Sequence, residues 1–133
     1  MKPTVLSFNL SGDAQQKLRL ACMRLKVFYR PADSRLQHTA LRAILSGEAP
    51  VPHEASEAPF SDAMVVFANL PQASLNTLLS LWRQMGIPPV PLKAVLTDTN
   101  ADWTPVQLRD ELKKEAEWFA THRTSAHEET AGD

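Results

Sequence analysis

The sequence contains few of the residues that metal, redox and phosphate sites need. It has one cysteine, Cys22, so no internal disulfide can form and a reducing compartment is the default expectation. Only four glycines are present, and none belongs to a phosphate-binding loop or to a nucleophile elbow. The four histidines lack the spacing of zinc ligands. We therefore expect no metal and no cofactor, and an enzyme is the less favoured class.

Neither sign of charge dominates, and no long hydrophobic run is present. Fourteen basic and fifteen acidic residues are scattered along the chain and give a net charge of −1, which removes the usual electrostatic reason to expect nucleic acid or an anionic membrane as partner. No apolar stretch approaches the ~20 residues of a membrane span, and the first residues, "MKPTVLSF", do not resemble a secretory signal. We expect a cytoplasmic protein that binds neither nucleic acid nor a membrane.

The sequence does contain apolar runs of strand length separated by helical patterns. The strand-like runs cover 4–9, 26–30, 64–68 and 92–97. The helical patterns cover 14–25, 34–46, 75–85 and 105–121. In the last of these, Leu108, Leu112, Ala116 and Phe119 fall on one inward stripe, and Trp118 is expected in the core or in a groove wall. The predicted order is strand, helix, strand, helix, given twice.

Short matches at similar offsets suggest that the chain repeats itself. "LKVFY" (25–29) parallels "LKAVL" (92–96), and "LRAIL" (41–45) parallels "LRDEL" (108–112). Chance matching of common residues is the alternative. We predict a single α/β domain over 1–121, followed by a flexible polar tail. Its parts are half one at 1–46, a surface linker rich in Pro, Ala and Glu at 47–63, half two at 64–121, and the tail at 122–133.

Strand composition predicts the order of one shared four-stranded sheet. The first and third strands are almost uninterrupted apolar runs, as central strands covered by helices should be. The second and fourth carry Lys26 and Lys93, and lysine commonly guards an edge strand. Two pseudo-repeated halves related by a two-fold axis would make the central pair antiparallel, in a ferredoxin-like two-layer arrangement with extra helices. The alternative is an all-parallel, doubly wound sheet.

A polar segment, "TDTNADW" (97–103), leads into the last helix. Thr104, Pro105 and Gln107 form the pattern of a capping box, with Trp103 and Leu108 placed as a hydrophobic staple. "SRLQ" (34–37) has the same capping pattern. Local structure therefore explains most of the segment without a ligand.

The stretch "PLKAVLTDTNADWTPVQLRDELKKE" (91–115) resembles a family of small bacterial proteins known only as a domain of unknown function. The family pattern is a lysine in a strand, then "LT", an asparagine and a tryptophan, followed by a helix with "EL" and a closing glutamate. Here these are Lys93, Leu96, Thr97, Asn100, Trp103, Glu111, Leu112 and Glu115. The resemblance covers about 64–117 and implies a fold-sized unit without an activity.

The resemblance marks Lys93, Thr97, Asn100 and Trp103 as a group, and the predicted topology adds further polar residues near the strand ends. Asn9 and Asn69 end the first and third strands, and Thr97 to Asn100 follow the fourth. In an all-parallel sheet these residues would share one rim with Arg30 and could bind a nucleotide, anion or other small molecule. With an antiparallel central pair, Asn9 and Asn69 would lie at opposite ends. An Asn100 that only fixes its own loop is the alternative interpretation.

Two functional hypotheses follow. The first is a non-enzymatic interaction or regulatory module that pairs through an open sheet face or edge, either as a homodimer or with another protein. The second is a small-molecule or nucleotide/anion-binding domain that uses the loop after the fourth strand. Its candidate residues are Lys93, Thr97, Asn100, Trp103, Asn69, Asn9 and Arg30.

Overall fold

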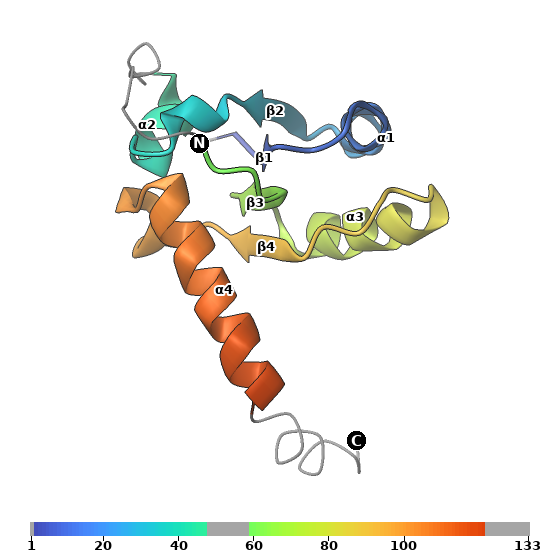
Figure 1. Cartoon of the computed structure of the whole chain (residues 1–133). Coiled ribbons are helices and arrows are strands. Elements are labelled where there is room, and N and C mark those ends of the chain that lie inside the picture. Colours follow the sequence, from blue (N-terminus) through green and yellow to red (C-terminus); the bar gives the residue numbers. More distant parts are fainter. Residues whose placement is uncertain (1, 48–58, 122–133) are drawn as a thin grey trace.

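The computed structural model of the chain describes residues 2–47 and 59–121. Strands and helices alternate along this part of the chain (Figure 1). The first half contains β1 (Thr4–Phe8), α1 (Gly12–Leu25), β2 (Phe28–Ala32), the 3-10 turn η1 (Ser34–Leu36) and α2 (Leu41–Ser46). The second contains β3 (Met64–Ala68), α3 (Gln72–Gln84), β4 (Leu92–Val95), the 3-10 turn η2 (Asn100–Asp102) and α4 (Pro105–Thr121).

The strands form one four-stranded sheet in the order β2-β1-β3-β4. The prediction that the first and third strands are central is confirmed. Each half contributes a parallel pair, β1 with β2 and β3 with β4, whereas the central strands β1 and β3 run antiparallel. The all-parallel alternative is therefore wrong. The parallel pairs require crossovers, which α1 and α3 supply.

Helices cover both faces of the sheet, so the protein has three layers where two were expected. Successive strand residues point to opposite faces: Val5 and Phe67 pack in a cluster with residues of α1 and α3, while Leu6 and Val66 pack in a second cluster with residues of α2 and α4. The helices expected as extras form the third layer. This double cover explains why all five residues of β3 are buried.

The second strand begins two residues later than predicted because α1 ends at a left-handed residue. Ser11 begins the helix by accepting the Ala14 N–H through its hydroxyl oxygen. Lys26 ends it with φ 56°, and its N–H is directed to the last helical carbonyls. Lys26 is thus a helix cap rather than an edge-strand lysine. The exposed Pro31 protects the β2 edge instead, since proline offers no N–H to a further strand.

The helix predicted over 34–46 is broken into η1 and α2. Asp33 caps η1 by accepting the Arg35 N–H at 2.8 Å. The buried Gln37 does not return to Ser34, because its side-chain oxygen accepts the Phe60 N–H at 3.0 Å. The second predicted capping box is therefore wrong, and Gln37 instead ties the two halves of the chain together.

The predicted surface linker 47–63 ends in a well-packed segment. Phe60 is buried, with its ring centroid 5.5 Å from that of Phe8. The carbonyls of Phe60 and Asp62 both accept hydrogen bonds from the Asn9 side chain, at 2.9 and 3.0 Å. This returning segment therefore closes the carboxyl end of β1. Residues 48–58 and the predicted tail 122–133 lie outside the described residues.

Candidate functional site

The polar loop after β4 uses its side chains to fix itself. The Thr97 N–H donates to Asn100 Oδ1 at 2.8 Å, and the Asn100 N–H donates to Thr97 Oγ1 at 3.1 Å. Asn100 Nδ2 also donates to the Val95 carbonyl at 3.1 Å. Both polar atoms of the Asn100 side chain are thus engaged within the loop. The geometry favours the interpretation that Asn100 holds the strand-to-helix turn.

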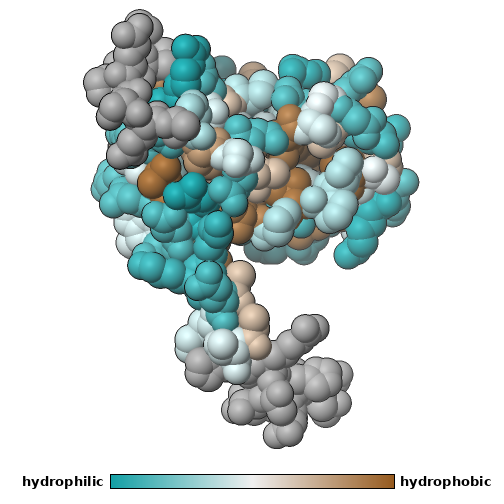
Figure 2. Space-filling view, viewed as in Figure 1, coloured by the Kyte–Doolittle hydropathy of each residue, from teal (hydrophilic) through white to brown (hydrophobic). Residues whose placement is uncertain are grey.

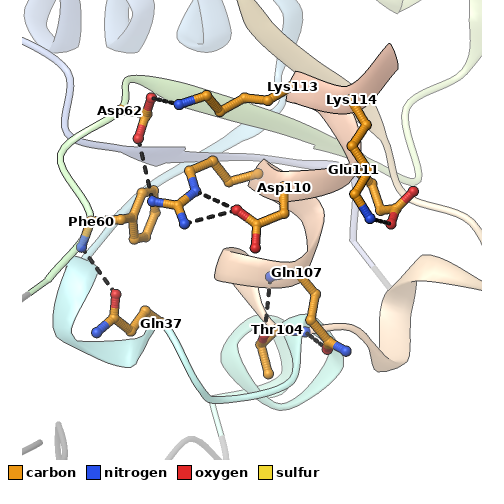
Figure 3. A network of polar contacts seen from close by, with 10 residues as sticks. Gln37, Phe60, Asp62, Thr104, Gln107, Asp110, Glu111, Lys113 and Lys114 are labelled. Atoms are coloured by element: carbon orange, nitrogen blue, oxygen red, sulfur yellow. Dashed lines mark hydrogen bonds and ion pairs between the residues drawn. The ribbon is translucent and has the colours of Figure 1, made fainter. Parts of the chain in front are cut away.

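The capping box predicted at the start of α4 is confirmed. The Thr104 N–H donates to Gln107 Oε1 at 2.9 Å, and the Gln107 N–H donates to Thr104 Oγ1 at 3.2 Å (Figure 3). Trp103 is half-buried and packs in the same cluster as Leu108, as the predicted staple requires. Its carbonyl also accepts the Leu41 N–H at 2.9 Å, which joins this turn to α2.

The structure does not bring the other candidate binding residues to this loop. Lys93 points to the opposite face of the sheet from Trp103, and its Nζ lies 5.1 Å from the ring centroid of Trp82 in α3. Arg30 is exposed on β2, the edge strand farthest from β4. Asn9 and Asn69 lie at opposite ends of the antiparallel central pair. Of the seven candidates, the loop and its surroundings hold Asn69, Thr97, Asn100 and Trp103.

A cleft of about 400 Å³ lies at the carboxyl ends of the parallel strands β3 and β4. Asp98 and Arg42 are its charged residues, and sequence reasoning missed Arg42, which belongs to α2. Arg42 Nε lies 3.1 Å from Asp102 Oδ1, so its charge is already paired. With Asp98 beside it, the cleft has no excess of positive charge and is poorly suited to a phosphate. Its lining residues are Arg42, Asn69, Leu96, Thr97, Asp98 and Ala101.

A polar network anchors the first half of α4 to the body. The Arg109 guanidinium lies 5.8 Å from the Phe60 ring centroid, 2.8 Å from an Asp110 oxygen and 3.5 Å from an Asp62 oxygen. Lys113 Nζ lies 3.6 Å from the other Asp62 oxygen (Figure 3). The segment that closes β1 therefore also holds α4 in position.

The second half of α4 leaves the body. We call residues 112–121 the arm. Leu108 is 2% exposed, but the same helical stripe continues through Leu112 and Ala116 to Phe119, which is 58% exposed. Trp118, expected in the core or a groove wall, is 52% exposed and meets Phe119 edge-on, with ring centroids 5.1 Å apart.

The arm extends past β4, the edge strand of the sheet (Figure 1). In Figure 2 its outer side is hydrophilic, while hydrophobic residues face the underside of the body. Beyond Leu112, which still packs against the core, the arm is thus an amphipathic helix with no body beneath its apolar side.

The described residues offer little for metal or nucleophilic chemistry. Cys22 is buried in α1, and burial raises the pKa of its thiol to about 12, so the reactive thiolate is scarce at neutral pH. Within residues 2–47 and 59–121, no group of three His, Cys, Asp or Glu side chains could hold a metal ion. In the same part of the chain, no helix is long and apolar enough to cross a membrane.

Comparison with known proteins finds a similarity to one described family, confined to the second half of the chain. Residues 63–119 match the family model of a domain of unknown function (DUF3783). The match runs from β3 to residue 119, near the end of α4, and so includes the cleft loop, the α4 anchor and nearly all of the arm. Searches among curated proteins and among solved structures give no significant match. The second half is therefore similar to a family that has a name and no assigned activity.

Proposed function

We propose that this protein is a non-enzymatic interaction module and that the arm of α4 is its docking surface. The observation that carries the proposal is the apolar stripe that begins in the core at Leu108 and continues onto the exposed Phe119. A helix that served only its own core would lose its apolar residues where the cover ends. Large apolar residues that continue into solvent on a fixed helix are typical of a binding surface.

Three features of the fold support this assignment over an open sheet surface. Helices cover both faces of the central strands, so the open sheet surface expected from the sequence is limited, within the described residues, to the exposed Val95 side of β4. The β2 edge is protected by Pro31, and Asn100 occupies the Val95 carbonyl at the β4 edge. The network around Arg109 holds the root of the arm in place. Less conformational entropy is therefore lost when a partner binds the arm.

We further propose that the two halves derive from an internal repeat. Asn9 follows β1 and Asn69 follows β3, and both adopt φ 59° at the turn into the next helix. Each half then completes a parallel β–α–β unit. On this interpretation the halves differ most in their last helix, since α2 has 6 residues and α4 has 17.

The single buried cysteine is the support for a cytoplasmic location.

A small polar ligand in the cleft is the second candidate function. Arg42 and Asp98 line the cleft together, so a ligand whose carboxylate replaces Asp102 on Arg42 and whose ammonium group meets Asp98 would match it better than a nucleotide. Thermal-shift screening with amino acids and inorganic phosphate tests this candidate. Stabilisation by an amino acid that Arg42→Ala abolishes would support it, and stabilisation by neither class would end it.

The interaction proposal is tested by site-specific photocrosslinking of the full chain in its host cells. A photoreactive phenylalanine analogue at position 119 should give discrete crosslinked products of higher mass. The matched control places the analogue at Met23, which is 67% exposed on α1. Equal crosslinking at the two positions, or none at position 119, would contradict the proposal.

A further inference from the structure

The β4 edge carries a second exposed apolar residue, on the face opposite to the arm. Val95 is 52% exposed, and it pairs in register with Phe67, whose side chain lies on the α1 and α3 face of the sheet. Lys93 lies on the same face of β4, beside α3. The arm belongs to α4, which packs on the other face. One chain therefore has an uncovered strand surface and an apolar helix with nothing to cover, separated by the sheet itself.

We propose that the occupant of the arm is the Val95 and Lys93 surface of a second copy of this chain, in a reciprocal exchange. This inference rests on the proposed function, and it names the partner. A two-fold axis along the β4 edge, parallel to the strand, exchanges both the two faces and the two sides of that edge. The arm of each copy then lies over the α3 face of the other copy. In the dimer, the arm of one copy covers the β4 edge of the other copy's sheet, as helices cover the sheet faces within one chain.

Charge complementarity favours a second copy over an unrelated apolar partner. On the arm, Lys114 engages Glu111 at 3.3 Å. Glu115 stands beside the apolar stripe, one turn before Phe119, and takes part in no ion pair within residues 59–121. In the exchanged arrangement this carboxylate approaches Lys93 of the other copy, while Phe119 covers Val95. The arm thus offers an apolar residue with a neighbouring anion, and the strand surface offers an apolar residue with a neighbouring cation.

The size of the contact also requires two-fold symmetry. The arm has ten residues and is about 15 Å long at ~1.5 Å per residue, so one arm on one strand surface buries less than the ~800 Å² per partner of a standard interface. A closed two-fold exchange makes the same contact twice, because each copy supplies both an arm and a strand surface. We expect a reversible dimer in the micromolar range.

Sedimentation velocity of the full chain over a wide concentration range tests the proposal. The wild type should change from monomer to dimer as concentration rises. Phe119→Glu on the arm and Val95→Glu on the strand should each stay monomeric. Met23→Glu, the same change at an exposed apolar residue of α1, should dimerise like the wild type. Circular dichroism of each variant confirms that the chain is folded.

Mixing the two defective variants separates reciprocal exchange from pairing of arm against arm. A heterodimer of Phe119→Glu with Val95→Glu retains one intact arm on one intact strand surface, so the mixture should partly dimerise although neither variant does so alone. If arms paired with arms, Val95→Glu would dimerise by itself, and the proposal would be wrong. The charged pair gives a second readout: Lys93→Glu and Glu115→Lys should each weaken the dimer at least tenfold, and the double variant should recover most of the loss.

Failure of this inference is distinguishable from failure of the proposed function. A wild type that remains monomeric at every concentration overturns the exchange. Crosslinking from position 119 to a different protein would then leave the interaction module standing with another partner. A monomer that also gives no crosslink from position 119 would end both proposals.

Discussion

Asn9 shows how one side chain can satisfy a strained backbone and a long-range contact together. Its φ of 59° lies in the left-handed region, which asparagine tolerates better than most residues. Its amide nitrogen meanwhile reaches the carbonyls of Phe60 and Asp62. Asn69 has the same φ after β3 but lies beside the open cleft. The local conformation is thus shared by the two halves of the chain.

Two substitutions at Asn9 separate the backbone effect from the hydrogen bonds. Asn9→Gly removes both bonds but keeps the left-handed turn accessible, so it should lower the free energy of unfolding by about 1–2 kcal/mol. Asn9→Ala also removes both bonds, and alanine has neither the freedom of glycine nor the tolerance of asparagine for a left-handed backbone, so it should cost about 1 kcal/mol more than Asn9→Gly. Urea unfolding measures both values. Equal losses for the two variants would show that the turn carries no conformational cost.

The Cys22 thiol should make stability depend on alkaline pH. Its pKa is raised by burial to about 12 from an ordinary value of 9.0, so between these values the folded chain retains a proton that the unfolded chain releases. Stability must therefore fall as pH rises through this window. Cys22→Ala lacks this titration; it should be the less stable chain at neutral pH, and its deficit relative to wild type should shrink at about pH 10.5. A deficit unchanged between the two pH values would contradict the argument.

At the scale of elements, the cap of α4 is the clearest local determinant of structure. Thr104→Ala removes the acceptor of the Gln107 N–H and should lower the free energy of unfolding by about 1 kcal/mol. Thr104→Ser should keep most of that stability because serine offers the same oxygen. Thr77→Ala is the matched control: the Thr77 hydroxyl donates to a carbonyl inside α3 and caps nothing. The cap account requires that Thr104→Ala cost clearly more than Thr77→Ala.

Sequence patterns predicted the elements whose signals are local. The bounds of β3 and α4 agree with the predicted runs, because an uninterrupted apolar strand and a capped helix are specified by neighbouring residues. The break between η1 and α2 was missed because Gln37 binds Phe60, a residue far along the chain. The extra helices were predicted without a face, and α2 and α4 together cover the second face of the sheet. Nothing in local periodicity specifies which side of a sheet a helix covers.

The site was predicted less well than the fold, for a related reason. Thr97 and Asn100 were grouped with Lys93 and Trp103 as candidate binding residues, and the reciprocal hydrogen bonds between Thr97 and Asn100 explain their proximity without a ligand. Lys93 was grouped with them by the family pattern, although the alternation of strand residues turns it to the other face. Arg42 comes from the other half of the chain, so no pattern in the second half could indicate it.

At the scale of the whole molecule, the length of α4 accounts for the arm. Its 17 residues span about 25 Å at ~1.5 Å each, whereas four strands spaced ~4.8 Å apart are only about 15 Å across. A helix that crosses the strands must therefore extend beyond the sheet. The direction in which α4 crosses the sheet therefore leaves Trp118 and Phe119 exposed, and the sequence does not specify that direction.

The arm should be almost dispensable for folding of the monomer, which leaves its apolar residues free for binding. Leu108→Ala empties a site that is 2% exposed and should cost about 2–4 kcal/mol. Phe119→Ala, in dilute solution where the chain is monomeric, should change the free energy of unfolding by less than about 0.5 kcal/mol. Urea unfolding at low protein concentration measures both, and a large loss for Phe119→Ala there would show that the arm packs on its own body.

Concentration then reveals what the arm is for. If a second copy covers it, the wild-type melting temperature must rise with protein concentration, because the dimer forms from folded chains only. At a protein concentration about 100 times the dissociation constant, dimer formation stabilises the folded chain by roughly 2.7 kcal/mol. That is enough to raise the melting temperature by several degrees. Phe119→Glu should melt at one temperature throughout, equal to the wild-type value extrapolated to high dilution. Parallel slopes for the two chains would mean that any association of this protein uses a surface other than the arm.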